Sequence, residues 1–151
     1  MLAAQALDVS VILPTYNEAA SIAWLVPEIL TALEAAELKA EVIVVDDDSP
    51  DGTAAVAEEL GEKLPVRVIK RPGERGMATA ALLGFNASSA TVCVVMDADG
   101  SHPVPAMVAV DAHCREIAGP AEVGRRAEVE AMGGEYRVAA GTRRDAADDM
   151  G

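Results

Sequence analysis

The chain has 151 residues, 51% hydrophobic and 25% charged, which is the composition of one globular domain and excludes a largely disordered chain. Its formal net charge of −13 disfavours a nucleic-acid-binding surface, because such a surface needs a basic patch. An acidic chain can still bind a nucleotide when a divalent cation bridges the two sets of negative charge.

Short apolar runs alternate with helical patterns over the first two thirds of the chain. The runs are rich in valine and isoleucine and end at polar or turn residues, as buried strands do, and apolar residues recur at helical spacing between them. In chain order we predict a strand at 9–13, a helix at 18–36 with a kink at Pro27, a strand at 41–45, a helix at 54–63, a strand at 66–69, a helix at 77–88 and a strand at 91–96. This alternation predicts an α/β fold with a mostly parallel sheet and helices on both faces.

The last third of the chain carries weaker signals. In chain order we predict a helix at 105–118, an insertion without a clear pattern at 119–135, a strand at 136–140 and a frayed tail at 145–151. We predict a single domain over 1–151. Cys93 and Cys114 lack the spacing of a metal or redox motif, so we expect two buried free thiols and a reducing compartment.

The sequence shows no targeting or membrane-spanning segment. Residues 1–7 lack both a basic region and an apolar stretch of signal-peptide length, and no run approaches the ~20 apolar residues of a spanning helix. We therefore expect a cytoplasmic location, with membrane contact limited to peripheral binding or to an anchoring partner subunit.

The sharpest local feature is Asp97-Ala98-Asp99, which follows the predicted strand at 91–96. Ligands of parallel sheets bind at the carboxyl ends of the strands, where two carboxylates can turn toward one ion. Their hard oxygen atoms suit Mg²⁺ or Mn²⁺, and such an ion can take further ligands from a diphosphate and neutralise a phosphate leaving group. A lone Asp-x-Asp is common, however, and the competing interpretation is a polar loop after a strand.

A second acidic cluster ends the predicted strand at 41–45. A carboxylate at Asp46 can accept hydrogen bonds from a base or a ribose, as acidic residues do in other nucleotide-binding folds. Asp48, Ser49 and Asp51 are good turn and capping residues, so we assign them that structural role.

Further polar residues flank the first strand and the acidic pair. The ring of Tyr16 can stack on a base, and Glu18 can read a base edge or compensate the dipole of the next helix, which we expect Asn17 to cap. Arg143 has a guanidinium that fits a phosphate, although an isolated arginine is more often a surface charge. His102 lies beside the acidic pair and can support it.

Five motifs occur in a fixed order along the chain. They are Val-Ile-Leu-Pro-Thr-Tyr-Asn-Glu (11–18), Val-Val-Asp-Asp-Asp-Ser-Pro-Asp-Gly-Thr (44–53), Gly-Met-Ala-Thr-Ala (76–80), Met-Asp-Ala-Asp-Gly-Ser-His-Pro (96–103) and Gly-Thr-Arg (141–143). Together they resemble family 2 glycosyltransferases of the GT-A fold, and the second and fourth motifs resemble the dolichyl- or polyprenyl-phosphate mannosyltransferases more narrowly. The resemblance covers about residues 9 to 105 and a patch near 138 to 143.

The resemblance implies a set of site residues. Those expected to hold a guanine nucleotide are Pro14, Tyr16, Glu18, Val44 and Asp46. Those expected to contact the diphosphate or the sugar donor are Asp97, Ala98, Asp99 and Arg143. The implied metal ligands are Asp97, Asp99 and Ser101, and Asp99 is the implied catalytic residue.

The resemblance also implies a reaction. Mannose would be transferred from GDP-mannose to dolichyl or polyprenyl phosphate with inversion, using Mg²⁺ or Mn²⁺. The acceptor phosphate is already anionic near neutral pH, so no dedicated general base is required. The implied location is the cytosolic face of a membrane, which would be the endoplasmic reticulum in a eukaryote.

The chain departs from the family pattern at several positions. Gly100 stands where the family usually has leucine, Glu74-Arg75 replaces a stretch that usually carries lysine, and Ala78 replaces a usual glycine. The segment 114–135 is longer than the family's link. The chain stops soon after Arg143, so we expect a C-terminally short form in which donor binding is better supported than turnover.

Three competing functions remain open. Met96-Asp97-Ala98-Asp99-Gly100-Ser101 also resembles the loop of haloacid-dehalogenase-type phosphatases, in which the first aspartate would be a nucleophile. That loop usually follows the first strand, whereas three predicted strands precede it here. The second competing function is that of a family 2 glycosyltransferase for a different nucleotide sugar, and the third is that of a catalytically inactive nucleotide-binding fragment.

Overall fold

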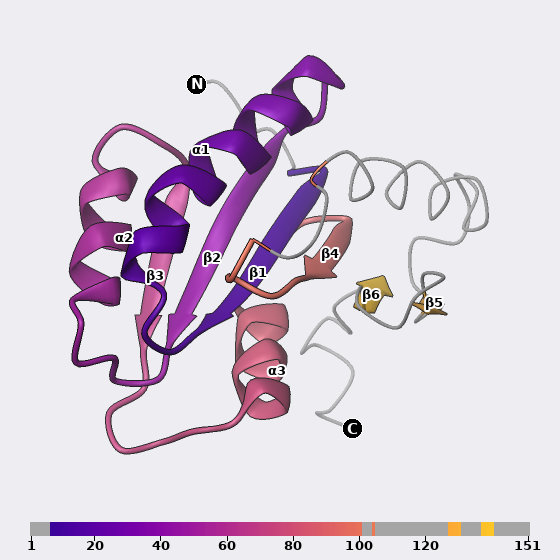
Figure 1. Cartoon of the computed structure of the whole chain (residues 1–151). Helices are drawn as coiled ribbons and strands as arrows, with labels where there is room; N and C mark the ends of the chain where they lie inside the picture. Colours follow the sequence, from indigo (N-terminus) through magenta and orange to yellow (C-terminus); the bar gives the residue numbers. More distant parts are fainter. Residues whose placement is uncertain (1–6, 101–103, 105–126, 131–136, 141–151) are drawn as a thin grey trace, which may run out of the picture.

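A six-stranded sheet forms the centre of the computed structural model, which describes residues 7–100, 104, 127–130 and 137–140. Its strands are β1 (Val9–Thr15), β2 (Ala40–Asp46), β3 (Val66–Lys70), β4 (Val92–Val95), β5 (Ala127–Glu130) and β6 (Arg137–Ala140). The helices that connect the first four strands are α1 (Ala19–Ala35), α2 (Thr53–Gly61) and α3 (Met77–Ala87). Strands and helices therefore alternate up to β4, as the sequence pattern predicts (Figure 1).

The strand order brings distant parts of the chain to one edge of the sheet. The order is β3-β2-β1-β4-β6-β5, in which β1 to β4 are parallel and β6 is antiparallel to both β4 and β5. β1 lies between β2 and β4, with Thr15 opposite Asp46 and Ile12 opposite Val95. The carboxyl ends of β1, β2 and β4 are therefore neighbours, which is the arrangement that a ligand site at this edge requires.

The predicted elements between residues 9 and 96 are confirmed, and their ends differ by at most two residues. The predicted strand at 136–140 is confirmed as β6. β5 was not predicted, and it falls within the stretch 119–135 that we interpret as an insertion. The predicted helix at 105–118 and the predicted tail at 145–151 lie outside the described residues, and the single-domain organisation stays a prediction.

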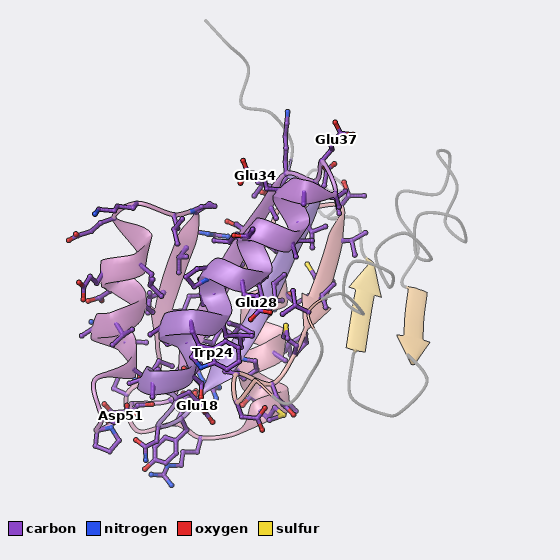
Figure 2. The ribbon with its side chains drawn as sticks, turned by 45° about the horizontal axis from the view of Figure 1, so that its top comes forward. Glu18, Trp24, Glu28, Glu34, Glu37 and Asp51 are labelled. Atoms are coloured by element: carbon purple, nitrogen blue, oxygen red, sulfur yellow. The ribbon has the colours of Figure 1, made fainter. Side chains whose placement is uncertain are left out.

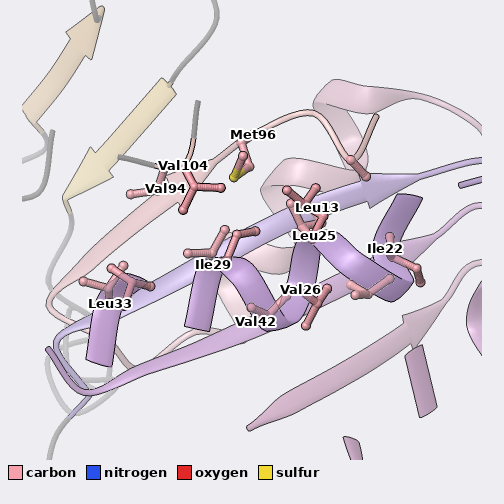
Figure 3. Packing of buried hydrophobic residues seen from close by; sticks show 14 of the residues in the cluster. Leu13, Ile22, Leu25, Val26, Ile29, Leu33, Val42, Val94, Met96 and Val104 are labelled. Atoms are coloured by element: carbon pink, nitrogen blue, oxygen red, sulfur yellow. The ribbon is translucent and has the colours of Figure 1, made fainter. Parts of the chain in front are cut away.

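Two apolar layers cover the two faces of the sheet, because successive strand residues point to opposite sides. Val11 and Leu13 of β1 belong to the cluster that includes Leu25 of α1 (Figure 3). Ile12, which points the other way, joins Ala80 of α3 in a second cluster. Helices therefore cover both faces, as predicted.

The helix α3 lies very close to the sheet at one glycine. A Cβ atom added to Gly84 would lie 2.5 Å from Cγ2 of Ile12 and 3.3 Å from Cγ2 of Val45. The first distance is shorter than any ordinary carbon–carbon contact, so this position requires the smallest residue. The glycine thereby sets the distance between α3 and the two central strands.

The helix α1 is the longest described helix and passes through Pro27, which lies inside it. The kink predicted at this proline stays a prediction. Among the described residues, no helix combines the length and the apolar character needed to cross a lipid bilayer.

Cys93 in β4 is a buried free thiol, as predicted. Burial raises the pKa of this thiol above its usual value, because the thiolate is poorly solvated there. A raised pKa makes the side chain behave as a small apolar residue. Cys114 lies outside the described residues.

Candidate functional site

Carboxylates from three strand ends gather at the carboxyl edge of the sheet. Partial burial raises the pKa of Glu18, which follows β1, and this burial is the largest cause of the shift. A hydrogen bond with Ser21 opposes this shift, and the negative charges of Asp99, Asp51 and Asp97 add smaller contributions that raise the pKa. The strand order places β1 between β2 and β4, so the strand ends that precede these acidic residues are neighbours. The acidic pair after β4 and the carboxylate after β1 therefore lie at the same edge of the sheet.

Asp46 at the end of β2 is 2% exposed and firmly held. One carboxylate oxygen, Oδ1, accepts hydrogen bonds from Thr15 Oγ1 at 2.9 Å and from Ser49 Oγ at 2.6 Å. The other, Oδ2, accepts a bond from the Ser49 amide at 3.0 Å. An ionised carboxylate has about four acceptor sites, so these bonds fix its orientation without exhausting its capacity. Its predicted role as a nucleotide contact stays a prediction.

Side chains of the segment between β2 and α2 hold the chain where α1 begins. The Asn17 amide donates to Ser49 Oγ at 2.9 Å, the Glu18 amide to Thr53 Oγ1 at 3.0 Å and the Ala19 amide to Asp51 Oδ2 at 3.1 Å. The structural role predicted for Ser49 and Asp51 is therefore confirmed.

The helix cap itself was predicted wrongly. Glu18 rather than Asn17 is the capping position of α1, and no side chain of its own segment caps the helix. Asn17 has a φ of 55°, in the left-handed region that asparagine tolerates better than most residues. Its backbone therefore departs from the extended conformation of a usual capping residue. The predicted turn role of Asp48 agrees with its φ of 56°.

A buried ion pair fastens the loop between β3 and α3 to the end of β2. Arg71 Nε and Nη2 donate to the two oxygens of Asp47 at 2.7 and 2.8 Å. The remaining donors of Arg71 bind Glu74, Thr79 and the carbonyl of Gly76. Burial favours a higher pKa for Asp47, but the bonds and charge of Arg71 and the bond from the Gly76 amide outweigh it and lower the pKa below its usual value.

The ring of Tyr16, for which we predict base stacking, is covered by an arginine. Cζ of Arg75 lies 3.9 Å from the centroid of the ring, and the same guanidinium donates a hydrogen bond to the tyrosine hydroxyl. Tyr16 is 37% exposed. A base that stacked on the covered face would have to displace Arg75. The stacking role of Tyr16 stays a prediction.

The remaining predicted nucleotide contacts differ in their exposure. Pro14 lies within β1 and is buried. Val44 of β2 is 0% exposed and packs in the core on the α1 side, so its side chain contacts other core residues. Ala98 is 3% exposed, Asp97 is half-buried and Asp99 is exposed. Ser101 and Arg143 lie outside the described residues, as does His102.

The sequence model of glycosyl transferase family 2 matches residues 10–109. The chain belongs to this family. The matched span contains the acidic pair and the carboxylates around it, and it favours the family 2 interpretation over a phosphatase.

Three curated relatives of this family 2 domain carry names of one kind, which combine a polyprenol or dolichol with mannose. A dolichol-phosphate mannosyltransferase of Pyrococcus furiosus is 50% identical over 97 residues, which cover 64% of this chain and 27% of that protein. A polyprenol monophosphomannose synthase of Mycolicibacterium smegmatis is 42% identical over 97 residues, covering 61% and 35%. A dolichol-phosphate mannosyltransferase of Saccharomyces cerevisiae is 38% identical over 100 residues, covering 64% and 37%. The chain thus spans between a quarter and two fifths of the length of these relatives.

Solved structures confirm the GT-A fold. One of them is the mannosyltransferase PcManGT from Pyrobaculum calidifontis in complex with GDP-Man and Mn²⁺. It aligns with this chain with a TM-score of 0.63 at 25% identity, and the alignment covers 90% of this chain and 45% of PcManGT. A glucosyl-3-phosphoglycerate synthase from Mycobacterium tuberculosis, in complex with Mn²⁺, UDP and phosphoglyceric acid, aligns with a TM-score of 0.55 at 22% identity, covering 89% and 56%. The latter likeness supports the fold alone.

The carboxyl edge of this family 2 domain fits a divalent cation. Asp97 and Asp99 offer hard oxygen atoms, and together with Glu18 they form a region of negative charge that a cation would relieve. Within the described residues, no three histidine, cysteine or acidic side chains are placed to hold an ion by themselves. This agrees with the usual way of binding Mg²⁺, in which one or two carboxylates act together with the phosphates of a substrate.

Several residues that shape the site were not predicted from the sequence. Thr53 is the last residue of the motif 44–53, whereas Arg71 lies outside the five motifs. An arginine directly after one strand and two consecutive aspartates after another can form a buried ion pair, but only the strand order shows that these strands, β3 and β2, are neighbours. The contact of Arg75 with Tyr16 carries no sequence signal, since it depends on how the loop 71–76 is held.

Proposed function

We propose that the chain binds GDP-mannose together with Mg²⁺ or Mn²⁺ at the carboxyl edge of its sheet. We further propose that it belongs to an enzyme that transfers mannose to dolichyl or polyprenyl phosphate with inversion. The observation that carries the proposal is the placement of Asp97 and Asp99 after β4, at the sheet edge where Glu18 follows β1, in a segment 50% identical to a dolichol-phosphate mannosyltransferase. The structural relative that binds GDP-Man and Mn²⁺ adds support for the donor and the metal.

The proposed roles follow from the positions of the side chains. Asp97 and Asp99 would hold the cation with help from Ser101, and the diphosphate would complete its ligands. When bound, the cation would offset the charge that develops on the departing nucleotide. Asp99 would be the catalytic residue, because it is the exposed member of the pair and can reach the reacting diphosphate.

The remaining roles concern the rest of the donor. Tyr16 and Glu18 would contact the base, while Asp46, whose carboxylate is already oriented by Thr15, would bind the nucleoside. Pro14, Val44 and Ala98 have buried side chains, so they would complete the nucleotide subsite through their backbone atoms, and Arg143 would bind the sugar donor.

The lipid acceptor and the membrane location are proposed from the names of the relatives alone. Dolichyl or polyprenyl phosphate is a lipid substrate, so the full enzyme would act at the cytosolic face of a membrane, by peripheral contact or through an anchoring partner. Because the chain spans so little of the length of its relatives, donor binding is the activity to test in it first.

Calorimetric titration with GDP-mannose, GDP and UDP-glucose, each with Mn²⁺ or with a chelator, tests the proposal. We expect GDP-mannose and GDP to bind only with the metal. The variant Asp99→Ala should abolish this binding and retain the fold, because the cation would lose a ligand while an exposed side chain is removed. Glu34→Ala is a matched control, since it removes an exposed carboxylate toward the far end of α1 (Figure 2).

Two outcomes would contradict the proposal. Equal binding of GDP-mannose in chelator would remove the metal from the mechanism. Binding of UDP-glucose without any response to GDP-mannose would assign the chain to another branch of the family.

A further inference from the structure

An indole ring from α1 lies against the loop that carries the acidic pair. A Cβ atom added to Gly100 would lie 2.5 Å from both Cζ2 and Cη2 of Trp24. Gly100 directly follows Asp99, and its φ of 77° is in the left-handed region. The six-membered part of the indole therefore contacts the backbone one residue after the acidic pair, and this contact exists only because residue 100 has no side chain.

Trp24 stands on a rigid element although it is itself half exposed. Its neighbours Leu25 and Val26 are fully buried against the sheet, while Trp24 is 50% exposed. Trp24 and Glu18 belong to the same N-terminal part of α1 (Figure 2). A half-exposed side chain contributes less to the core than its buried neighbours do, and the indole of Trp24 lies against the backbone at Gly100. A ring fixed to a packed helix is a firm support for a loop.

The contact between Trp24 and Gly100 also excludes a larger residue at position 100. A leucine there would meet the indole, and its backbone would resist the left-handed conformation that glycine adopts readily. The apolar bulk beside the acidic loop thus comes from α1 in this chain.

We propose that Trp24 is a positioning residue for metal binding: its indole supports the loop at Gly100 and so orients the carboxylate of Asp99 toward the cation. The inference rests on the proposed function, because it assumes that Asp97 and Asp99 hold the metal. Residues that orient metal ligands without binding the metal themselves typically change metal affinity about 10–100-fold when they are removed. We expect a loss in this range for Trp24→Ala.

The test measures Mn²⁺ affinity in the presence of GDP by the electron paramagnetic resonance of free Mn²⁺, a readout independent of transfer activity. Trp24→Ala should weaken Mn²⁺ binding at least about tenfold. Trp24→Phe should retain most of the affinity, because an aromatic ring would still lie against the loop at Gly100. Gly100→Ala should cause a similar loss, because the new methyl group would push the loop away from the indole. Combining Trp24→Ala with Gly100→Ala should cost less than the sum of the two single losses.

The matched control is Leu82→Ala, which removes another exposed apolar side chain, from α3, and should leave Mn²⁺ affinity unchanged. Thermal midpoints in chelator should be similar for Trp24→Ala and the unaltered chain, which separates positioning from general stability.

Each result decides between the two proposals. If the unaltered chain binds Mn²⁺ with GDP and Trp24→Ala binds it equally well, the positioning role is overturned and the proposed function stands. If the unaltered chain binds no Mn²⁺ even with GDP, both proposals fail.

Discussion

At the scale of single residues, Arg71 shows how a buried charge is tolerated. The side chain is 6% exposed, and all five of its N–H donors meet acceptors, among them both oxygens of Asp47. A buried guanidinium without such partners would be very costly, because water no longer solvates its charge. The pair ties β2 to the loop that places Arg75 over Tyr16, so its effect reaches the candidate site.

Asp47→Ala should destabilise the fold by about 3–5 kcal/mol, because Arg71 would remain buried without its counter-charge. Urea unfolding followed by circular dichroism measures the loss. Glu58→Ala is the matched control: it breaks the Lys70–Glu58 ion pair, whose side chains are 58% and 52% exposed, and should cost at most about 1 kcal/mol. Equal losses for the two variants would show that burial is not what makes the first pair matter.

At this scale, the positions of the charged residues in the site were easier to predict from the sequence than their hydrogen-bond and ion-pair partners. The acidic clusters at 46–48 and 97–99 could be located because each directly follows an apolar strand. The internal bonds of Asp46 and the saturation of Arg71 depend on the strand order, which a single sequence does not contain. The predicted cap at Asn17 failed because side chains from another segment serve that end of α1.

At the scale of elements, the strength of the apolar pattern decided what could be predicted. β1 and β2 are buried almost throughout and form continuous apolar runs in the sequence. β5 has the sequence Ala-Glu-Val-Glu and lies at the edge of the sheet, where a short strand rich in charge is common. Such a segment lacks the apolar run that identifies a buried strand, so the sequence offers no reason to expect it.

The close approach of α3 to the sheet leads to a prediction for Gly84. Gly84→Ala would gain about 1 kcal/mol of helix propensity but would force a methyl group into Ile12. Overpacking typically costs about 1–3 kcal/mol, so we expect a net destabilisation of up to about 2 kcal/mol in thermal or urea unfolding.

Asn86→Ala provides the comparison for that variant. It replaces an exposed residue of the same helix and should be neutral or slightly stabilising. Should Gly84→Ala stabilise the protein as well, the contact with Ile12 would have to be looser than the structure indicates.

At the scale of the whole molecule, the net charge of −13 means that a bound cation should stabilise the folded chain in addition to its proposed role in the reaction. Like charges that gather in a folded chain repel one another, and an ion held among them relieves this repulsion. A ligand that binds only the folded state also stabilises it by mass action.

Mn²⁺ with GDP, at about one hundred times its dissociation constant, should therefore stabilise the fold by about 2.7 kcal/mol. For a chain of this length the melting temperature should rise by about 5–10 °C, measurable by differential scanning calorimetry. Asp99→Ala should show no rise. A rise that survives in chelator would point to a site that does not need the metal.

The beginning of α1 has one more consequence for phosphate chemistry. In many nucleotide-binding folds the first helix binds the pyrophosphate with its own amide groups and with the positive end of its dipole. Here the first amide of the helix is already engaged: Asp51 accepts a bond from the Ala19 amide, while Thr53 and Ser49 accept bonds from the two amides before it. An arriving diphosphate would therefore meet a resident carboxylate at this end of α1. It would need to bring its own counter-ion, and the acidic pair across the edge is where that ion would settle.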